Sequence, residues 1–377
     1  MNMMYKQNFL AAVATAAMVL GATQIALAAQ SVPALPLSSD LSSRISTIAS
    51  TVPPNGDVNP YGVAVVPMSM GSLVQGDVLV SNFNNSQNLQ GTGTTIVEIS
   101  PGGGMRVFAH VNAHRLPGDC PGGVGLTTAL AVTRSGWVFV GSLPTTNGMS
   151  NTARAGCVLV LDDRGEVVET ISGSPINGPW DMAAVDQGDH VTLFVSNVLN
   201  GTVAGQGKVV NRGTIVRLEV QTSMMDRPHV RAMTVVGSGF SERTDPGALV
   251  IGPTGLGLSP DRNALYVADS LNNRIAVIAN PMSRMGSSGN GRTLTMDGTL
   301  NDPLGLTTTS NGDVLTVNGN DGFLVRTNPQ GMQMNKLLLD NSGSPPGAGA
   351  LFGLAVRPGG GLYFVDDAQN TLMLLRF

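Results

Sequence analysis

The stretch Gly255–Ile278 reads GLGLSPDRNALYVADSLNNRIAVI and contains a small apolar anchor, a turn and two apolar strands in succession. Weaker copies of its opening residues recur at intervals of 48 to 74 residues and begin at Gly62, Ala129, Asp181, Gly305 and Gly353. Repetition at about this period indicates a repeat architecture, in which each unit buries its apolar surface only by stacking on its neighbours. The sequence therefore predicts six copies of one unit.

Short runs of β-branched and aromatic residues follow each anchor, which predicts strands. Turn signals such as Asn311-Gly312 precede them, because these residues favour the backbone conformations of tight turns. No window shows a capped apolar stripe of period 3.6, so we expect helix to be nearly absent. The predicted second strands of the six units lie at residues 78–80, 138–140, 193–195, 265–267, 314–317 and 363–365.

The two ends of the repeat array complement each other. The sixth unit has no fourth strand after residues 372–375, whereas a spare strand-like segment, residues 44–51, precedes the first anchor. If this segment completes the last unit, the ring closes and no open sheet edge remains. The sequence thus predicts one all-β domain over residues 43–377, a six-bladed β-propeller of four-stranded blades closed by an N-terminal strand.

The N-terminus resembles an export signal. Lys6 precedes an apolar run, residues 9–20, and Ala26-Leu27-Ala28 fits the small-x-small rule for cleavage, so we expect a signal peptide over residues 1–28 and a linker over 29–42. An uncleaved anchor is less favoured, because the run is shorter than the roughly 20 residues that span a bilayer. We expect a periplasmic or secreted protein with no integral membrane span after cleavage.

The composition of the chain argues against one class of partner and points to a disulfide. The chain has 21 Lys and Arg against 25 Asp and Glu, a net charge of −4, and only 12% charged residues, so we expect no nucleic-acid partner. Cys120 and Cys157 are its only cysteines. Because export places both in an oxidising compartment, we expect them to form a disulfide.

The string YVADSLNNRI, Tyr266–Ile275, resembles the signature of NHL repeats, and weaker versions occur at residues 81–85 and 366–370. The longer run GLGLSPDRNALYVADS is also similar to the gluconolactonase and SMP-30 proteins. These resemblances imply a six-bladed propeller over roughly residues 43–377. They do not imply an activity, because the scaffold serves binding modules, lactonases and lyases.

The resemblances also imply metal sites that the residues do not support. In the gluconolactonase and SMP-30 proteins, carboxylate and Asn ligands of a divalent metal include two just before the anchors. The matching residues here include no Asn or carboxylate: Tyr61, Thr128, Trp180, Thr254, Leu304 and Phe352. Propeller lyases of the NHL class use His-bound zinc, but no anchor holds one of the four histidines, and we expect His110 and His114 to lie on a loop. We therefore expect no metal and no cofactor.

The candidate ligand contacts lie at the expected channel mouth, on the starts of the innermost strands. Trp180-Asp181 offers an aromatic plane beside a carboxylate, although a packed Trp and a hydrogen-bonded Asp are the plainer alternative. Extra residues lie in four insertions, at residues 110–125, 144–156, 200–212 and 221–250, and binding residues often gather on such loops. Within the last insertion we expect a fourth strand at residues 230–236. The predicted ligand-binding set is Tyr61, Trp180, Asp181, Thr254 and Phe352, and no catalytic residue is assigned.

One polar residue follows each second strand, and we expect these side chains to fix turns rather than to form a functional ring. They are Asn82, Ser142, Asn197, Asp269 and Asp367, with Gly319 in the fifth unit. The sequence favours recognition of a small molecule, glycan, peptide or partner protein. A lyase- or lactonase-type enzyme with its site at the channel mouth, similar to gluconolactonases or streptogramin lyases, is the alternative. An envelope structural or assembly factor is a third class.

Overall fold

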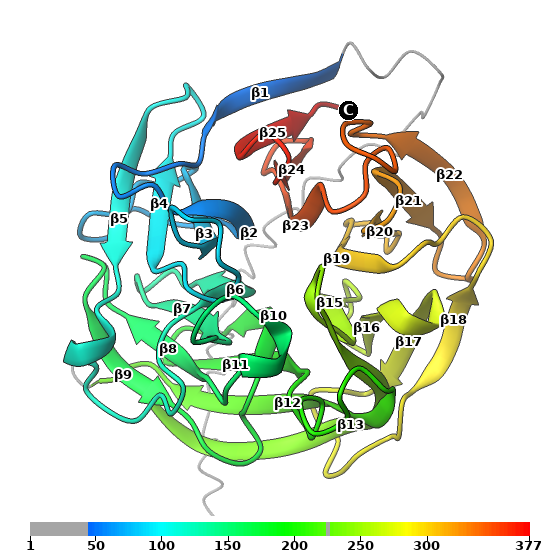
Figure 1. Cartoon of the computed structure of the whole chain (residues 1–377), viewed down its shortest axis with the longest axis horizontal. Coiled ribbons are helices and arrows are strands. Elements are labelled where there is room, and N and C mark those ends of the chain that lie inside the picture. The colour runs from blue at the N-terminus through cyan, green and yellow to red at the C-terminus, as the bar shows by residue number, and fades with distance from the viewer. Residues whose placement is uncertain (1–43, 224–226) are drawn as a thin grey trace, which may run out of the picture. The chain divides into compact units, whose positions relative to one another are not determined.

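Six antiparallel sheets are arranged around a central axis in the computed structural model, which describes residues 44–223 and 227–377 (Figure 1). The expected six-bladed β-propeller is confirmed. Helix is limited, within these ranges, to the 3-10 turns η2 (Ala113–Arg115), η3 (Ser150–Thr152) and η4 (Ser270–Asn272). The expected signal peptide and linker lie outside the described residues. None of the helices in the described ranges has the length and apolar character needed to cross a membrane.

Each blade begins with an inner strand at the axis and continues outward through hairpins. Blade 1 contains β2 (Val58–Val65), β3 (Val78–Asn84), β4 (Thr95–Ile99) and β5 (Met105–His110). Blade 2 contains β6 (Leu126–Val132), β7 (Val138–Ser142), β8 (Cys157–Leu161) and β9 (Val167–Ile171). Blade 4 contains β15 (Pro253–Leu258), β16 (Ala264–Asp269), β17 (Arg274–Ala279) and β18 (Arg292–Met296). Blade 5 contains β19 (Pro303–Thr308), β20 (Val314–Asn318), β21 (Phe323–Thr327) and β22 (Gln333–Leu338).

Blade 3 departs from the four-stranded expectation. It contains β10 (Pro179–Asp186), β11 (His190–Asn197), β12 (Val210–Gln221), β13 (His229–Asp245) and a fifth strand, β14 (Leu249–Ile251). The strand expected at residues 230–236 is present but much longer, and most of the insertion at 221–250 is strand, because β12 and β13 extend as a paired hairpin with several bulges. Even Gly237-Ser238-Gly239, which the sequence suggests as a loop, lies within β13.

The N-terminal strand closes the ring as predicted. β1 (Ile45–Ser50) pairs antiparallel with β25 (Thr371–Leu375), the third strand of blade 6, which also contains β23 (Leu351–Val356) and β24 (Leu362–Asp366). The register runs from Ile45 opposite Leu375 to Ser50 opposite Thr371. The Thr51 amide then donates to the Asn370 carbonyl at 2.9 Å. Blade 6 is thus built from both ends of the propeller domain.

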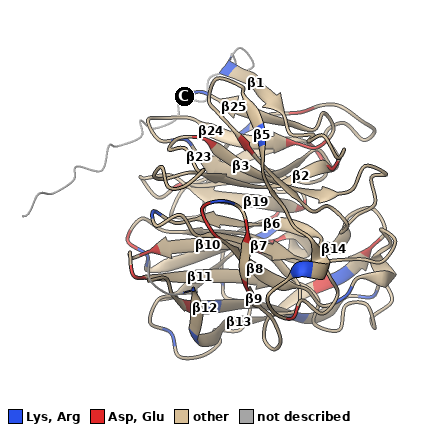
Figure 2. Ribbon diagram, turned by 90° about the vertical axis from the view of Figure 1, so that its left-hand side faces the viewer, with Lys and Arg blue, Asp and Glu red and all other residues tan. Residues whose placement is uncertain are grey.

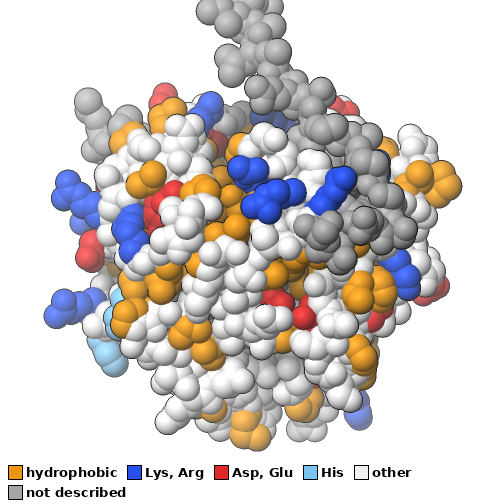
Figure 3. All heavy atoms as spheres, turned by 90° about the horizontal axis from the view of Figure 1, so that it is seen from above, with side chains coloured by type: hydrophobic (Ala, Val, Ile, Leu, Met, Phe, Trp, Pro, Cys, Tyr) orange, Lys and Arg blue, Asp and Glu red, His pale blue; other side chains and the backbone are white. Residues whose placement is uncertain are grey.

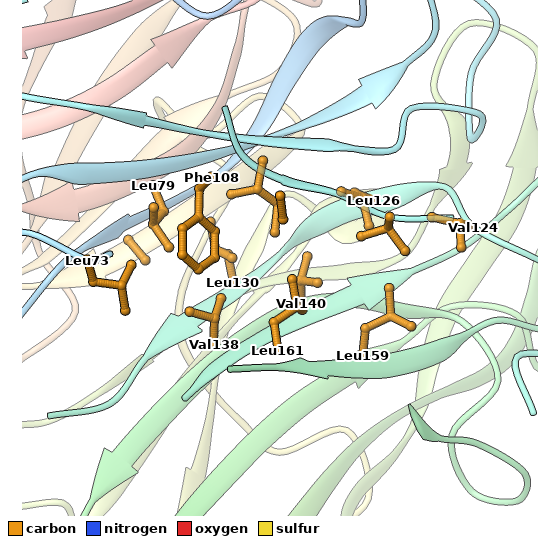
Figure 4. Close-up of a cluster of buried hydrophobic side chains, with 14 of the residues drawn as sticks. Leu73, Leu79, Phe108, Val124, Leu126, Leu130, Val138, Val140, Leu159 and Leu161 are labelled. Carbon is orange, nitrogen blue, oxygen red and sulfur yellow. The ribbon is translucent and has the colours of Figure 1, made fainter. Parts of the chain in front are cut away.

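The hydrophobic core is divided among the interfaces between blades. Every pair of neighbouring blades shares one cluster of buried side chains. Figure 4 shows the cluster between blades 1 and 2, where Leu79 and Phe108 of blade 1 face Leu130, Val138 and Leu161 of blade 2. Because each sheet buries both faces against neighbours, its strands are apolar without strict alternation.

Charged residues are few and lie mainly in loops and at strand ends (Figure 2). The side of the ring shown in Figure 3 is covered mostly by uncharged side chains, with hydrophobic ones in small groups. Large apolar side chains that remain exposed include Met285, Met332 and Met149. Solubility of this surface therefore depends on neutral polar groups more than on charge.

The expected disulfide is present. Cys120 and Cys157 are bonded, with their Cα atoms 5.2 Å apart and a sequence separation of 37. Cys157 begins β8, whereas Cys120 lies in the segment before β6. Next to the bridge the Gly122 amide donates to the Ala155 carbonyl at 2.6 Å. The bridge therefore holds two long connections of blade 2 together.

Removing β1 should open the ring. A chain that begins at residue 52 leaves β25 with an unpaired edge, which favours aggregation. We expect it to aggregate or to lose cooperative unfolding, whereas a chain that begins at Arg44 should stay monomeric. Size-exclusion chromatography and thermal unfolding measure both. A monomeric residue-52 chain with unchanged melting would contradict the closure.

Replacing both cysteines by serine should destabilise blade 2. The chain-entropy model gives a loss of about 3 to 4 kcal/mol for a loop of this length. Urea unfolding with and without reductant measures the loss, and reductant should not affect the double variant. Two alkylated thiols in unreduced, denatured wild-type protein, detected by intact mass, would refute the bridge.

Candidate functional site

A cavity of about 500 Å³ lies at the end of the central channel where the inner strands begin. Five structural units contribute to this cavity, which we call the mouth: the starts of β2, β10, β19 and β23, and the β13–β14 hairpin of blade 3. Connections that follow the second strands of blades 5 and 6 complete its wall. Its polar lining residues are Asn59, Arg243, Asp245, Asp302, Asn320 and Asp367.

Two carboxyl groups in the mouth titrate near neutral pH. Burial, followed by the nearby negative charge of Asp245, raises the pKa of Asp302 to about 6, although Arg243 opposes the shift. Burial and the neighbouring Asp366 raise the pKa of Asp367 to about 7. Groups with such pKa values can both accept and donate protons at physiological pH. The mouth is therefore equipped for proton transfer.

The β13–β14 hairpin places the only cation among the lining residues. The Arg243 guanidinium donates to the Asp245 carboxylate at 2.8 Å, and both side chains are partly exposed. The hairpin is fixed in place by Gln90, whose amide donates to the Gly247 carbonyl at 3.2 Å. A guanidinium has five N–H donors, so Arg243 keeps donors for a ligand while it pairs with Asp245.

Asn59 adds an unsatisfied acceptor. Its side chain is 7% exposed and its Oδ1 has no hydrogen-bond partner, which is costly for a buried polar atom. Asn59 and Asp302 occupy the same position in their blades, directly before the proline of the inner strand, and have φ values of 61° and 55°. Left-handed backbone at residues with side chains often accompanies functional sites. Blades 3 and 4 have glycine at this position. An Asn or Asp before the proline is therefore a sequence signal for both residues, and a comparison restricted to the anchors and the residues just before them does not detect it.

An aromatic cluster forms the floor of the mouth. The Tyr61 ring stacks on Phe83 and Phe352, with ring centroids 4.5 and 4.0 Å apart, and Trp180 meets Tyr61 and Phe83 edge-on. Burial and the charge of Asp367 raise the pKa of the Tyr61 hydroxyl. Tyr61, Phe83 and Trp180 are almost fully buried. Their ring faces are therefore occupied by one another more than they are offered to a ligand.

Asp181 lies at the next level of the channel. A second cavity, of about 350 Å³, follows the mouth and is lined by the inner strands of all six blades; we call it the chamber. Trp180 lines the mouth and Asp181 lines the chamber, so the structure separates these neighbours. Thr254 lines neither cavity, because its hydroxyl is buried against Ser270 Oγ at 2.8 Å. Of the predicted ligand-binding set, Tyr61, Trp180 and Phe352 meet at the mouth.

The anchors lie where adjacent inner strands approach most closely. A Cβ added at Gly305 would lie 1.8 Å from the Phe352 carbonyl oxygen, and one at Gly353 would lie 2.1 Å from that of Tyr61. Four anchors are glycine and Ala129 is the fifth. The small residue of the repeat is thus required by backbone contact between blades.

The metal site implied by the gluconolactonase resemblance does not fit these residues. Its matching positions are aromatic, aliphatic or threonine, and the described ranges hold no group of three His, Cys, Asp or Glu side chains that could bind a metal. His110 ends β5 and His114 lies in η2, so these two histidines do not share a helix face, although part of the expected loop is a 3-10 turn.

Most of the polar residues that follow the second strands fix local structure, as expected. Asp269 accepts from Arg274 Nε at 2.8 Å, so the NHL-like signature contributes a buried ion pair. Asn82 Nδ2 donates to the Thr51 carbonyl at 3.0 Å beside the closing strand. Asp367 differs, because it lines the mouth.

Comparisons with known proteins agree with this architecture. Residues 207–344 match the family described as SMP-30/Gluconolactonase/LRE-like region. The match covers the outer strands of blade 3 and all of blades 4 and 5, and it includes Arg243, Asp245 and Asp302. No curated protein sequence matches the chain.

Solved propellers superimpose over most of the chain. A gluconolactonase from Xanthomonas campestris has a TM-score of 0.53 and 14% identity, covering 92% of this chain and 94% of its own. Regucalcin, a calcium-binding protein from Agrobacterium tumefaciens, has a TM-score of 0.55 and 13% identity, covering 87% and 93%. The PQQ-bound aldose sugar dehydrogenase from Streptomyces coelicolor has a TM-score of 0.53 and 16% identity, covering 88% and 97%. At these identities the similarity shows a shared fold.

Adding one methyl group at an anchor should destabilise the ring. Gly305→Ala forces a Cβ against a backbone carbonyl that cannot rotate away, so we expect a loss of about 1 to 3 kcal/mol. Gly102→Ala is the matched control, because its added Cβ would have no neighbour closer than 3.9 Å. Urea unfolding compares the two, and equal stabilities would contradict the close approach.

Proposed function

We propose that this protein is a lactonase-type hydrolase whose reaction takes place in the mouth. The observation that carries the proposal is the presence of two carboxyl groups, Asp302 and Asp367, with pKa values of about 6 and 7 in one cavity. The family match over residues 207–344 supports an enzyme better than it supports the recognition module that the sequence favours. The gluconolactonase among the structural neighbours makes sugar lactones the first substrates to test.

The two carboxyl groups suit different roles. Asp302 has the lower pKa, so it is mostly ionised at pH 7 and accepts a proton from the attacking water. The resulting hydroxide adds to the lactone carbonyl carbon, and Arg243 donates a hydrogen bond to the oxygen that becomes negative. When the ring C–O bond breaks, Asp367 gives its proton to the leaving alkoxide. Exchange with solvent restores both carboxyl groups, and the product is a hydroxy acid.

The aromatic floor argues against recognition by ring stacking. Tyr61, Phe83 and Trp180 are at most 4% exposed, so among the four aromatic residues only Phe352 offers a partly open side chain. A glycan-binding module would need such faces open. The unsatisfied Asn59 Oδ1 instead offers an acceptor for a substrate hydroxyl group. We also propose export, as the N-terminal sequence predicts; the disulfide supports an oxidising compartment.

Replacing either carboxyl group should abolish most turnover. We expect Asp302→Asn and Asp367→Asn each to lower kcat/KM by about 100-fold or more, because each removes one proton-transfer group. Proton release during hydrolysis of δ-gluconolactone and other γ- and δ-lactones is the assay. Asp189→Asn, on an exposed turn, is the matched control and should retain full activity. If the folded wild-type protein accelerates no lactone hydrolysis, the proposal is wrong.

The pH profile separates the two roles. kcat/KM should rise as Asp302 loses its proton near pH 6 and fall as Asp367 loses its proton near pH 7. Residual activity of Asp302→Asn should lack the acidic limb, and that of Asp367→Asn should lack the alkaline limb. Limbs that persist in both variants would assign the proton transfers to other groups.

A further inference from the structure

Asp181 breaks the anchor rule of the repeat. The other five anchors are Gly62, Ala129, Gly255, Gly305 and Gly353, small because the next blade lies against them. A carboxylate at a position that otherwise requires almost no side chain conflicts with the local rule, and such conflicts tend to occur at functional sites. Asp181 has no role in the proposed hydrolytic reaction, because it lines the chamber and not the mouth.

The Asp181 carboxyl group links two blades and borders the chamber. Its Oδ1 accepts from the Met182 amide at 2.8 Å, and its Oδ2 accepts from the Leu256 amide of blade 4 at 3.0 Å. Each oxygen of a carboxylate has a second lone pair, so both can accept a further hydrogen bond. Among the described residues that line the chamber, no other side chain is ionisable. A charge carried into the chamber would therefore meet Asp181 alone.

The neighbouring hydroxyl groups also face a ligand as acceptors. Thr128 Oγ1 donates to the Trp180 carbonyl, and Thr308 Oγ1 donates to the Leu258 carbonyl at 2.6 Å. Since each hydroxyl has one hydrogen and these are used, their oxygens have only lone pairs left for a ligand. The remaining wall is largely aliphatic and includes Leu130, Leu306 and Leu354.

We propose that the chamber binds a primary organic ammonium ion, whose positive charge lies against Asp181 and whose alkyl chain lies against the leucine wall. A ligand that donates hydrogen bonds suits Asp181, Thr128 and Thr308, because these three side chains can only accept them when Asp181 is ionised. The cavity of about 350 Å³ lies within the roughly 300–1,000 Å³ range of small-molecule sites. The site is independent of the lactonase proposal, since no residue lines both cavities.

Binding of the cation should be linked to proton release. Burial raises the pKa of Asp181 to about 8, although its two amide donors oppose the shift. At pH 7 most Asp181 is therefore protonated, and a cation selects the ionised form. Each molecule bound at pH 7 should release nearly one proton, and affinity should rise about tenfold per pH unit below pH 7 and about fivefold between pH 7 and 8.

Titration calorimetry with n-pentylammonium chloride on the full chain tests the site. We expect saturable binding that Asp181→Asn weakens by about 10- to 100-fold, as expected for loss of a hydrogen bond to a charged group. Asp186→Asn is the matched control: it replaces a carboxyl group at the end of the same strand, paired with Arg134 outside the chamber, and should bind like wild type. The neutral isostere 1-pentanol should bind more weakly.

Proton release needs no variant, so it tests the site even if Asp181→Asn does not fold. Binding enthalpies should be measured at pH 7 in two buffers with different ionisation enthalpies. If nearly one proton is released per ligand, the two binding enthalpies should differ by nearly the difference between the buffers' ionisation enthalpies. The proposal is overturned if wild-type protein does not bind pentylammonium, if no proton is released, or if 1-pentanol or Asp181→Asn gives equal affinity. None of these readouts depends on hydrolytic activity, so failure here would leave the lactonase proposal untouched.

Discussion

Backbone contact between adjacent inner strands is the constraint on which the rest of this propeller depends. Hydroxyl groups of the second strands span the contact: Ser81 donates to the Thr127 carbonyl at 2.8 Å and Ser196 to the Thr254 carbonyl at 3.0 Å, each in the next blade. The hydroxyl oxygens of Ser81 and Ser196 each also accept a hydrogen bond from a backbone amide of the inner strand in their own blade. The contact leaves room only for glycine at most anchors.

The fold was predictable because each unit repeats the same physical demands. The strand period and the turn residues recur in all six units and a small anchor recurs in five, so an ambiguous unit can be interpreted by comparison with the others. The insertion in blade 3 has no second copy, and there the sequence misled. Glycine and serine at residues 237–239 suggest a turn, yet pairing with β12 keeps this segment in β13, with Gly239 at a φ of 81° near the register shifts. Local propensity was overridden by a long neighbouring strand.

The site was less predictable because its residues come from different blades and meet only in the folded ring. Asp302 and Asp367 belong to neighbouring blades and share no motif, and Asp245 belongs to the unrepeated insertion. Trp180 and Asp181 illustrate the opposite error, because adjacency in sequence suggested one site. The strand pairing of β10 with β11 is interrupted between Pro179 and Met182, and the two side chains end at different levels of the channel.

The burial that raises the pKa values of these carboxyl groups also lowers the stability of the fold when the groups are ionised. Asp181, Asp302 and Asp367 have folded-state pKa values of about 8, 6 and 7, and buried Glu242, beside Thr202, has one of about 7. A raised folded-state pKa means that the native state binds protons more tightly than the unfolded chain, whose carboxyl groups titrate near pH 4. The stability from these protons is fully present below pH 4 and is lost as pH rises through 6 to 8. Asp302 can therefore act as a base only at a pH where the raised pKa values already lower the free energy of unfolding. The disulfide and the closed ring stabilise the fold against this loss.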